Sequence, residues 1–202
     1  MSAWTDRLEV DYGVEALGEV PLVEQLRRLE PLESPYSRRL LVAAENGWTA
    51  YFDNDLQGGD PFPWVGHLSG ELSCHGVLAT HVPREQYRFP ATQFELLGLE
   101  GEPPLYYVRT VSAGIFDSGR WSFEAHGAVQ PFEQIARYGA RRVRDRLTRE
   151  MLVQYLQTLG IHADDPDFYD SCHLFQEHAT YERRTMSVEQ VRTEYTAGLR
   201  SL

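Results

Sequence analysis

The chain has 202 residues, a net charge of −11 and a hydrophobic fraction of 42%. This composition excludes a wholly disordered chain and is enough for one core, so we expect a single α+β domain over residues 1–202. All 19 basic residues are arginine, which excludes lysine Schiff-base chemistry and a P-loop. The negative charge disfavours nucleic acid and anionic membrane surfaces as partners and favours a basic protein.

The N-terminal 36 residues are acidic, with eight Asp and Glu against three Arg. Pro21 predicts the start of a short helix whose apolar stripe is Leu22, Val23, Leu26 and Leu29. Residues 1–6 lack the basic and apolar regions of a signal peptide, and no apolar run reaches the length of a membrane span. We therefore expect a cytoplasmic protein, with Cys74 and Cys172 reduced.

A hairpin is predicted over residues 40–53, where two β-rich runs flank Asn46 and Gly47. Both residue types tolerate positive φ, which a two-residue hairpin turn requires. An acidic loop over residues 53–60 follows the second strand. Asp60 and Pro61 then have the order of a helix cap and a first helical residue, which predicts a helix over 61–72.

The middle of the chain predicts extended structure. The β-rich runs are residues 77–82, 93–98, 105–111 and 120–125. Together with the hairpin they indicate about six strands, connected mainly by hairpins and therefore mainly antiparallel.

Helical spacing begins at Pro131 and predicts that most of the remaining chain is helical. Thr148 is expected to cap a helix whose buried face is Met151, Leu152, Tyr155, Leu156 and Leu159. Residues 162–181 fit either a short helix or an edge strand, and Ser187 with Gln190 forms a capping box. The fold class is therefore α+β: a mainly antiparallel sheet of about six strands with helices packed on it and a helical C-terminal third.

The acidic loop has two interpretations. Asp53, Asp55 and Gln57 before Gly58 match the start of an EF-hand loop, but Trp64 stands where a bidentate Glu is needed. We therefore expect no metal site and interpret the loop, with its neighbouring aromatic residues, as a protein-binding surface. Its residues are Trp48, Tyr51, Asp53, Asp55, Asp60 and Trp64.

Six arginines lie between residues 137 and 149. On a helix, Arg137, Arg141 and Arg144 would share one face and could bind a phosphate or carboxylate. The favoured interpretation is that this segment pairs with the protein's own acids.

No catalytic signature is present. The two cysteines and seven histidines lack metal-ligand spacing, and there is no nucleophile motif or dinucleotide motif, so we expect no cofactor and assign no catalytic residue. One alternative is a small biosynthetic or hydrolytic enzyme in which His81, His126, Glu124 or Arg109 meet in a pocket of the sheet. Another is a homo-oligomeric structural or regulatory component that associates through its C-terminal helices.

Two stretches, residues 47–54 and 144–151, resemble uncharacterised proteins of high-GC actinobacteria. Some such small acidic α+β proteins resemble immunity proteins, which bind and block a toxin domain. The resemblance implies an inhibitor that acts by occlusion of a basic partner, and it assigns no individual functional residue. This is the function we favour from the sequence.

Overall fold

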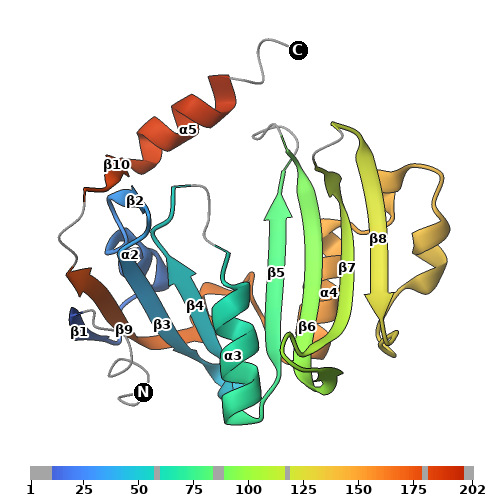
Figure 1. Cartoon of the computed structure of the whole chain (residues 1–202), viewed down its shortest axis with the longest axis horizontal. Helices are drawn as coiled ribbons and strands as arrows, with labels where there is room; N and C mark the ends of the chain where they lie inside the picture. Colours follow the sequence, from blue (N-terminus) through green and yellow to red (C-terminus); the bar gives the residue numbers. More distant parts are fainter. Residues whose placement is uncertain (1–10, 57–59, 84–88, 117–118, 179–181, 198–202) are drawn as a thin grey trace. The chain divides into compact units, whose positions relative to one another are not determined.

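A computed structural model of the protein describes residues 11–56, 60–83, 89–116, 119–178 and 182–197. This part of the chain is α+β, with ten strands in three antiparallel sheets and four α-helices (Figure 1). The chain divides into two compact units: residues 1–59 with 161–194 form unit 1, and residues 60–160 with 195–202 form unit 2. Residues 60–160 of unit 2 thus lie in the sequence between the two segments of unit 1. The single domain over residues 1–202 stays a prediction.

Unit 1 is built on a four-stranded sheet in the order β1-β9-β3-β4. The bounds are Asp11–Gly18 for β1, Tyr169–His178 for β9, Arg38–Ala44 for β3 and Thr49–Asp53 for β4. A two-stranded sheet pairs β2 (Leu32–Ser34) with β10 (Arg184–Met186), and α5 (Val188–Ala197) follows. Strand β9 lies between β1 and β3, so the ambiguous segment 162–181 contains an inner strand and not an edge strand.

The core of unit 1 lies on one face of this sheet. Its buried residues are Leu29, Leu40, Val42, Cys172 and Leu174. Helix α2 (Leu22–Arg27) and the residues after it cover this face, because Leu26 and Leu29 pack in the same cluster. The predicted N-terminal helix is confirmed, although Val23 from its apolar stripe is 56% exposed.

Helix α2 is tied to the sheet by a buried amide. The Gln25 side chain is fully buried, and its Nε2 donates to the carbonyl oxygens of Val20 (2.6 Å) and Asp170 (2.7 Å). These bonds join the helix to the start of the second chain segment of unit 1.

The predicted hairpin is confirmed. Strands β3 and β4 pair antiparallel, with Leu40 opposite Phe52 and Val42 opposite Ala50. Asn46 (φ 57°) and Gly47 (φ 78°) both have positive φ, as the hairpin requires. The turn is longer than two residues, because Ala43 and Thr49 are the last paired positions.

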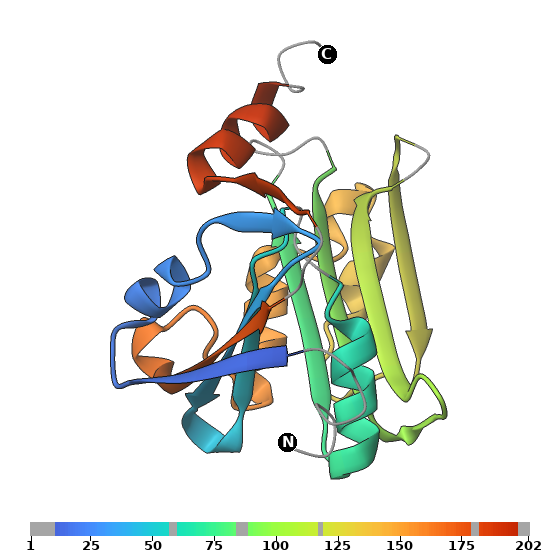
Figure 2. The same ribbon diagram turned by 60° about the vertical axis from the view of Figure 1, so that its left-hand side comes forward.

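Unit 2 is built on a four-stranded antiparallel sheet in the order β5-β6-β7-β8. The bounds are Gly76–Val82, Ala91–Glu102, Tyr107–Ile115 and Trp121–Gly127. Figures 1 and 2 show α3 (Phe62–Leu72) and α4 (Arg149–Thr158) on opposite sides of this sheet. Side chains agree with the views, since Gly66 of α3 lies against Leu97 and Tyr155 of α4 lies against Phe94.

The core beneath α4 is aromatic. The Phe94 ring is fully buried and lies edge-on to the rings of Phe132 (centroids 6.0 Å apart) and Tyr155 (5.8 Å). The predicted apolar face of α4 is confirmed by the burial of Met151, Leu152, Tyr155 and Leu156.

Two features of the predicted fold are wrong. There is no single sheet of about six strands, because the ten described strands divide among three sheets. The C-terminal third is not helical throughout, because β9 occupies ten residues of it. Residues 135–145 form only two 3₁₀ turns, Ile135–Gly139 and Val143–Asp145. The apolar spacing there does not mark a buried helical face, since Ile135 is 46% exposed.

Helix starts were predicted more accurately. Thr148 Oγ1 accepts a hydrogen bond from the Met151 N–H, and Ser187 and Gln190 form the reciprocal capping box. Across the described residues, every helix is too short or too polar to span a bilayer.

Candidate functional site

The acidic loop after β4 is organised around Asn54. This side chain is fully buried, and its Oδ1 accepts hydrogen bonds from the N–H groups of Ser37 (2.9 Å) and Arg38 (2.8 Å). Its Nδ2 donates to the carbonyl oxygen of Pro31 (2.9 Å). The neutral side chain of Asn54 therefore anchors the loop to the turn before β3.

The two carboxylates beside Asn54 are half-buried. Asp53 Oδ1 accepts from the Asp55 N–H at 3.1 Å, and Asp55 forms a backbone bridge with Glu33. Sequence reasoning expected these acids to face a partner. Their role in a binding surface stays a prediction, and part of their hydrogen-bonding capacity serves the loop itself.

Tyr51 and Asp53 belong to a partly buried polar cluster in unit 1. The Arg39 guanidinium lies over the Tyr36 ring, 4.8 Å from its centroid. Burial, with Asp53 and Tyr36 as neighbours, raises the pKa of the Tyr51 hydroxyl. Ion pairs continue the cluster: Glu177 lies 3.7 Å from Arg39 and 3.1 Å from Arg183. The cluster links β3, β9 and the residues before β10.

Three residues of the predicted surface remain: Trp48 is half-buried in unit 1, whereas Asp60 and Trp64 lie in unit 2. Asp60 Oδ1 accepts from the Phe62 N–H (3.0 Å), which confirms its expected place at the start of α3. Trp64 is half-buried on that helix.

The Arg-rich segment does not have the predicted geometry. Arg137 and Arg144 lie in two separate 3₁₀ turns, and Arg141 lies between them, so they do not share the face of one helix. Their assignment to an anion stays a prediction. Arg146 packs internally, with Nε donating to the Ala140 carbonyl (3.0 Å) and the guanidinium over the Phe123 ring.

Pairing with the protein's own acids, the interpretation favoured from the sequence, is seen within the described residues for one arginine of this segment, Arg144, which lies 3.8 Å from the neighbouring Asp145. For the other arginines it stays a prediction. Four arginines are exposed and form no ion pair with the part of the chain that the structure describes: Arg137, Arg141, Arg142 and Arg149.

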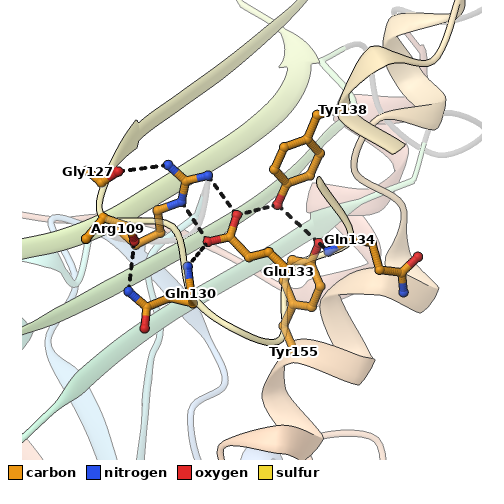
Figure 3. A network of polar contacts seen from close by, with 8 residues as sticks. Arg109, Gly127, Gln130, Glu133, Gln134, Tyr138 and Tyr155 are labelled. Carbon is orange, nitrogen blue, oxygen red and sulfur yellow. Dashed lines mark hydrogen bonds and ion pairs between the residues drawn. The ribbon is translucent and has the colours of Figure 1, made fainter. Parts of the chain in front are cut away.

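A buried ion pair lies between the sheet of unit 2 and the segment that follows β8. Arg109 donates from Nε and Nη2 to the two carboxylate oxygens of Glu133, at 2.9 and 2.7 Å. The exposed fractions of the two side chains are 4% and 0%. Figure 3 shows Arg109 reaching from β7 to this carboxylate, with the Tyr138 and Tyr155 hydroxyls beyond it.

Further donors complete the network around the Glu133 carboxylate. The Gln130 N–H donates to Oε1 (2.6 Å), and the Tyr138 hydroxyl donates to Oε2 (2.7 Å). Burial, followed by hydrogen bonds to Tyr155 and Glu133, raises the pKa of the Tyr138 hydroxyl. Each carboxylate oxygen thus accepts two hydrogen bonds and has little capacity left for a substrate. We interpret the network as a structural anchor for residues 128–140.

The four residues of the enzyme alternative do not meet in one pocket. Arg109 is buried in the network, whereas Glu124 and His126 form an exposed pair on β8, 3.7 Å apart. His81 lies at the end of β5, with Nδ1 3.1 Å from the Thr92 hydroxyl. Since His81 and Thr92 are directly opposite in the register of β5 and β6, this contact follows from strand pairing.

His81 does line a cavity of about 300 Å³ in unit 2. The cavity lies among the end of β5, the starts of β6 and β8 and the first turn of α4. Its lining residues are His81, Val82, Pro83, Pro90, Ala91, Thr92, Trp121, Arg144, Asp145, Leu147, Thr148, Arg149 and Glu150. Sequence reasoning selected His81 and Arg144 separately but gave no reason to place them around one cavity.

Within the described ranges, no group of three or more His, Cys, Asp and Glu side chains is arranged to hold a metal ion. Comparison of the chain with protein-family models, with curated proteins and with solved structures finds no match.

Proposed function

We propose that the protein is an acidic binding protein that acts by occlusion, as an immunity-type inhibitor does, and that unit 1 binds a basic partner protein. The observation that carries the proposal is the division of charge between the units. Unit 1 contains 19 Asp and Glu against 8 Arg, whereas unit 2 contains 11 of each. The whole net charge of −11 therefore belongs to unit 1.

The surface of unit 1 supports this assignment beyond the predicted loop. Four acids within seven residues are exposed and have no basic residue among them: Asp164, Asp165, Asp167 and Asp170. Helix α2 contacts the turn Pro166–Phe168 and itself carries the exposed Glu24 and Val23. Exposed acids together with an exposed hydrophobic residue are suited to a basic partner.

Occlusion needs affinity and fast capture but no chemical step. Carboxylates concentrated on one unit attract a basic protein over a distance comparable to the Debye length, about 10 Å at 0.1 M salt. We expect the association rate to fall with ionic strength, because steering by opposite charge is screened.

Neutralising substitutions test the proposal. Asp164→Asn, Asp165→Asn and Asp167→Asn remove three charges and keep the side-chain oxygens, including the Asp165 oxygen that accepts from the Asp167 N–H. The immobilised variant is compared with the unmodified protein in capture from lysate of the source organism, at low and high salt, with mass spectrometry of the retained proteins. For a basic protein so captured, we expect association to slow about tenfold or more.

A matched control removes the same charge from unit 2, through Glu71→Gln, Glu100→Gln and Glu124→Gln, all at exposed positions. Equal slowing by both triple variants would contradict a binding surface on unit 1. Asp53→Asn with Asp55→Asn separately tests the predicted loop, and unchanged association of that variant would exclude the loop from the surface. The homo-oligomeric alternative stays a prediction, tested by size measurement at several protein concentrations.

A further inference from the structure

The cavity of unit 2 combines an apolar interior with a charged rim. Of its lining residues, Pro90, Ala91 and Leu147 are buried, as is the mainly apolar Thr92. The charged residues around the cavity are exposed, among them Arg144 and Arg149. Trp121, at the start of β8, adds a half-buried aromatic ring to the lining.

The charged residues on the rim differ in whether they already have an ion-pair or hydrogen-bond partner. Arg144 is paired with Asp145 at 3.8 Å. The pKa of the Glu150 carboxylate is lowered by hydrogen bonds from its own backbone N–H and the Thr148 hydroxyl, with Arg149 and His81 as smaller causes. Arg149 forms no ion pair with the described residues, so its guanidinium has donors available for a ligand.

These observations set the charge and the shape of a suitable ligand. Among the described residues of the lining, two Arg are balanced by Asp145 and Glu150, so these residues do not supply the excess positive charge that a polyphosphate needs. One guanidinium with free donors suits a single carboxylate, which it can bind through two parallel hydrogen bonds. The apolar interior suits a hydrocarbon or aromatic body.

We propose that this cavity binds a small organic carboxylate, with the apolar body of the ligand inside the cavity and the carboxylate at Arg149. The proposal is independent of the occlusion function, because it uses only residues of unit 2. The site is also separate from the network of Figure 3, since the lining includes neither Arg109 nor Glu133.

Benzoate and benzamide test the proposal, because the two molecules have nearly the same shape and differ in charge. Isothermal titration calorimetry with the full chain should show saturable binding of benzoate and at least about tenfold weaker binding of benzamide. Inorganic phosphate, titrated in the same way, should bind more weakly than benzoate. Equal binding of benzoate and benzamide, no saturable binding of benzoate, or tighter binding of phosphate would each overturn the proposal.

Arg149→Gln and Arg137→Gln locate the site. Both arginines are exposed and lie in the same segment, but only Arg149 lines the cavity. Arg149→Gln should weaken benzoate about tenfold and leave benzamide unchanged, and Arg137→Gln should change neither. An equal loss in both variants would show a diffuse electrostatic effect and would overturn the assignment to this cavity.

Discussion

The two units anchor their irregular segments with side chains of opposite character. In unit 1, which carries the whole net charge, the buried anchor is the neutral amide of Asn54. In unit 2, where acids and arginines are equal in number, it is the charged pair of Arg109 and Glu133. An amide costs less to desolvate than a carboxylate, which requires several donors before it can be buried. The comparison shows that net charge describes the surface of a unit and does not predict which polar groups the unit buries.

The largest loss of stability is expected when the cation is removed from the buried pair in unit 2. Arg109→Met leaves the Glu133 carboxylate buried without its bidentate partner, and we expect unit 2 to lose about 3–5 kcal/mol of its free energy of unfolding. Hydrogen exchange measured by mass spectrometry should show lost protection in peptides of β7 and β8, with unit 1 peptides from β3 and β4 changed less.

Two further variants separate the charge from the packing. The double variant Arg109→Met with Glu133→Leu removes both charges and should recover much of the lost stability, because no unpaired charge remains buried. Glu124→Gln removes a carboxylate that is 62% exposed and should have little effect. A cost below about 1 kcal/mol for Arg109→Met would contradict the role of the pair as an anchor.

The corresponding test in unit 1 is Asn54→Ala. This change removes the acceptor of the Ser37 and Arg38 N–H groups and the donor to Pro31, and Ser37 is itself buried. We expect a loss of about 2 kcal/mol or more, measured by urea unfolding and by exchange at residues 31–41. Asn46→Gly is the matched control: Asn46 is exposed and has a φ of 57°, which glycine adopts readily, so this variant should retain its stability. Equal stability of the two variants would show that Asn54 is not an anchor.

Elements with a local signal were predicted from the sequence, and elements defined by distant partners were not. The hairpin of β3 and β4 and the caps at Thr148 and Ser187 depend on a few adjacent residues, and they are confirmed. Strand β9 pairs with β1 and β3, more than 120 positions earlier by the register of Leu174 with Leu40. The sequence alternates here between apolar and polar residues: Cys172 and Leu174 are buried and His173 is exposed. This alternation was too short to exclude a helix.

The Arg-rich segment shows why periodicity alone was misleading. Its apolar residues recur at helical spacing, yet only some of them pack against the core: Phe132 packs against Phe94, whereas Ile135 is exposed. The buried ion pair of Arg109 and Glu133 could not be predicted either, because no neighbouring residue in the sequence distinguishes Glu133 from the exposed Glu124. Its partner Arg109 lies 24 residues away and becomes a neighbour only when β7 and the segment after β8 are in place.

The smallest effect on stability is expected at Glu95 in β6, because this carboxylate of unit 2 is only half-buried. Burial is the largest cause that raises the pKa of Glu95, and the charge of Asp60 is the second. A hydrogen bond from the Tyr107 hydroxyl opposes the increase. A pKa raised on folding means that the folded state favours the protonated form. The contribution of Glu95 to stability is therefore present below the pKa of the unfolded chain, about 4.3, and is lost as the pH rises through the folded pKa.

Glu95→Gln mimics the protonated carboxyl and should be more stable than the unmodified protein at pH 7. The gain should stay below about 1 kcal/mol, because solvent screens a half-exposed group, and it should vanish near pH 4. Urea unfolding at the two pH values measures the difference, and Glu124→Gln, at an exposed position of β8, is the control. A Glu95→Gln variant that is less stable at pH 7 would show that the hydrogen bond from Tyr107 outweighs burial. Glu95 would then resemble Glu133, a carboxylate whose two oxygens each accept two hydrogen bonds, and the distinction between satisfied and unsatisfied carboxylates within unit 2 would be lost.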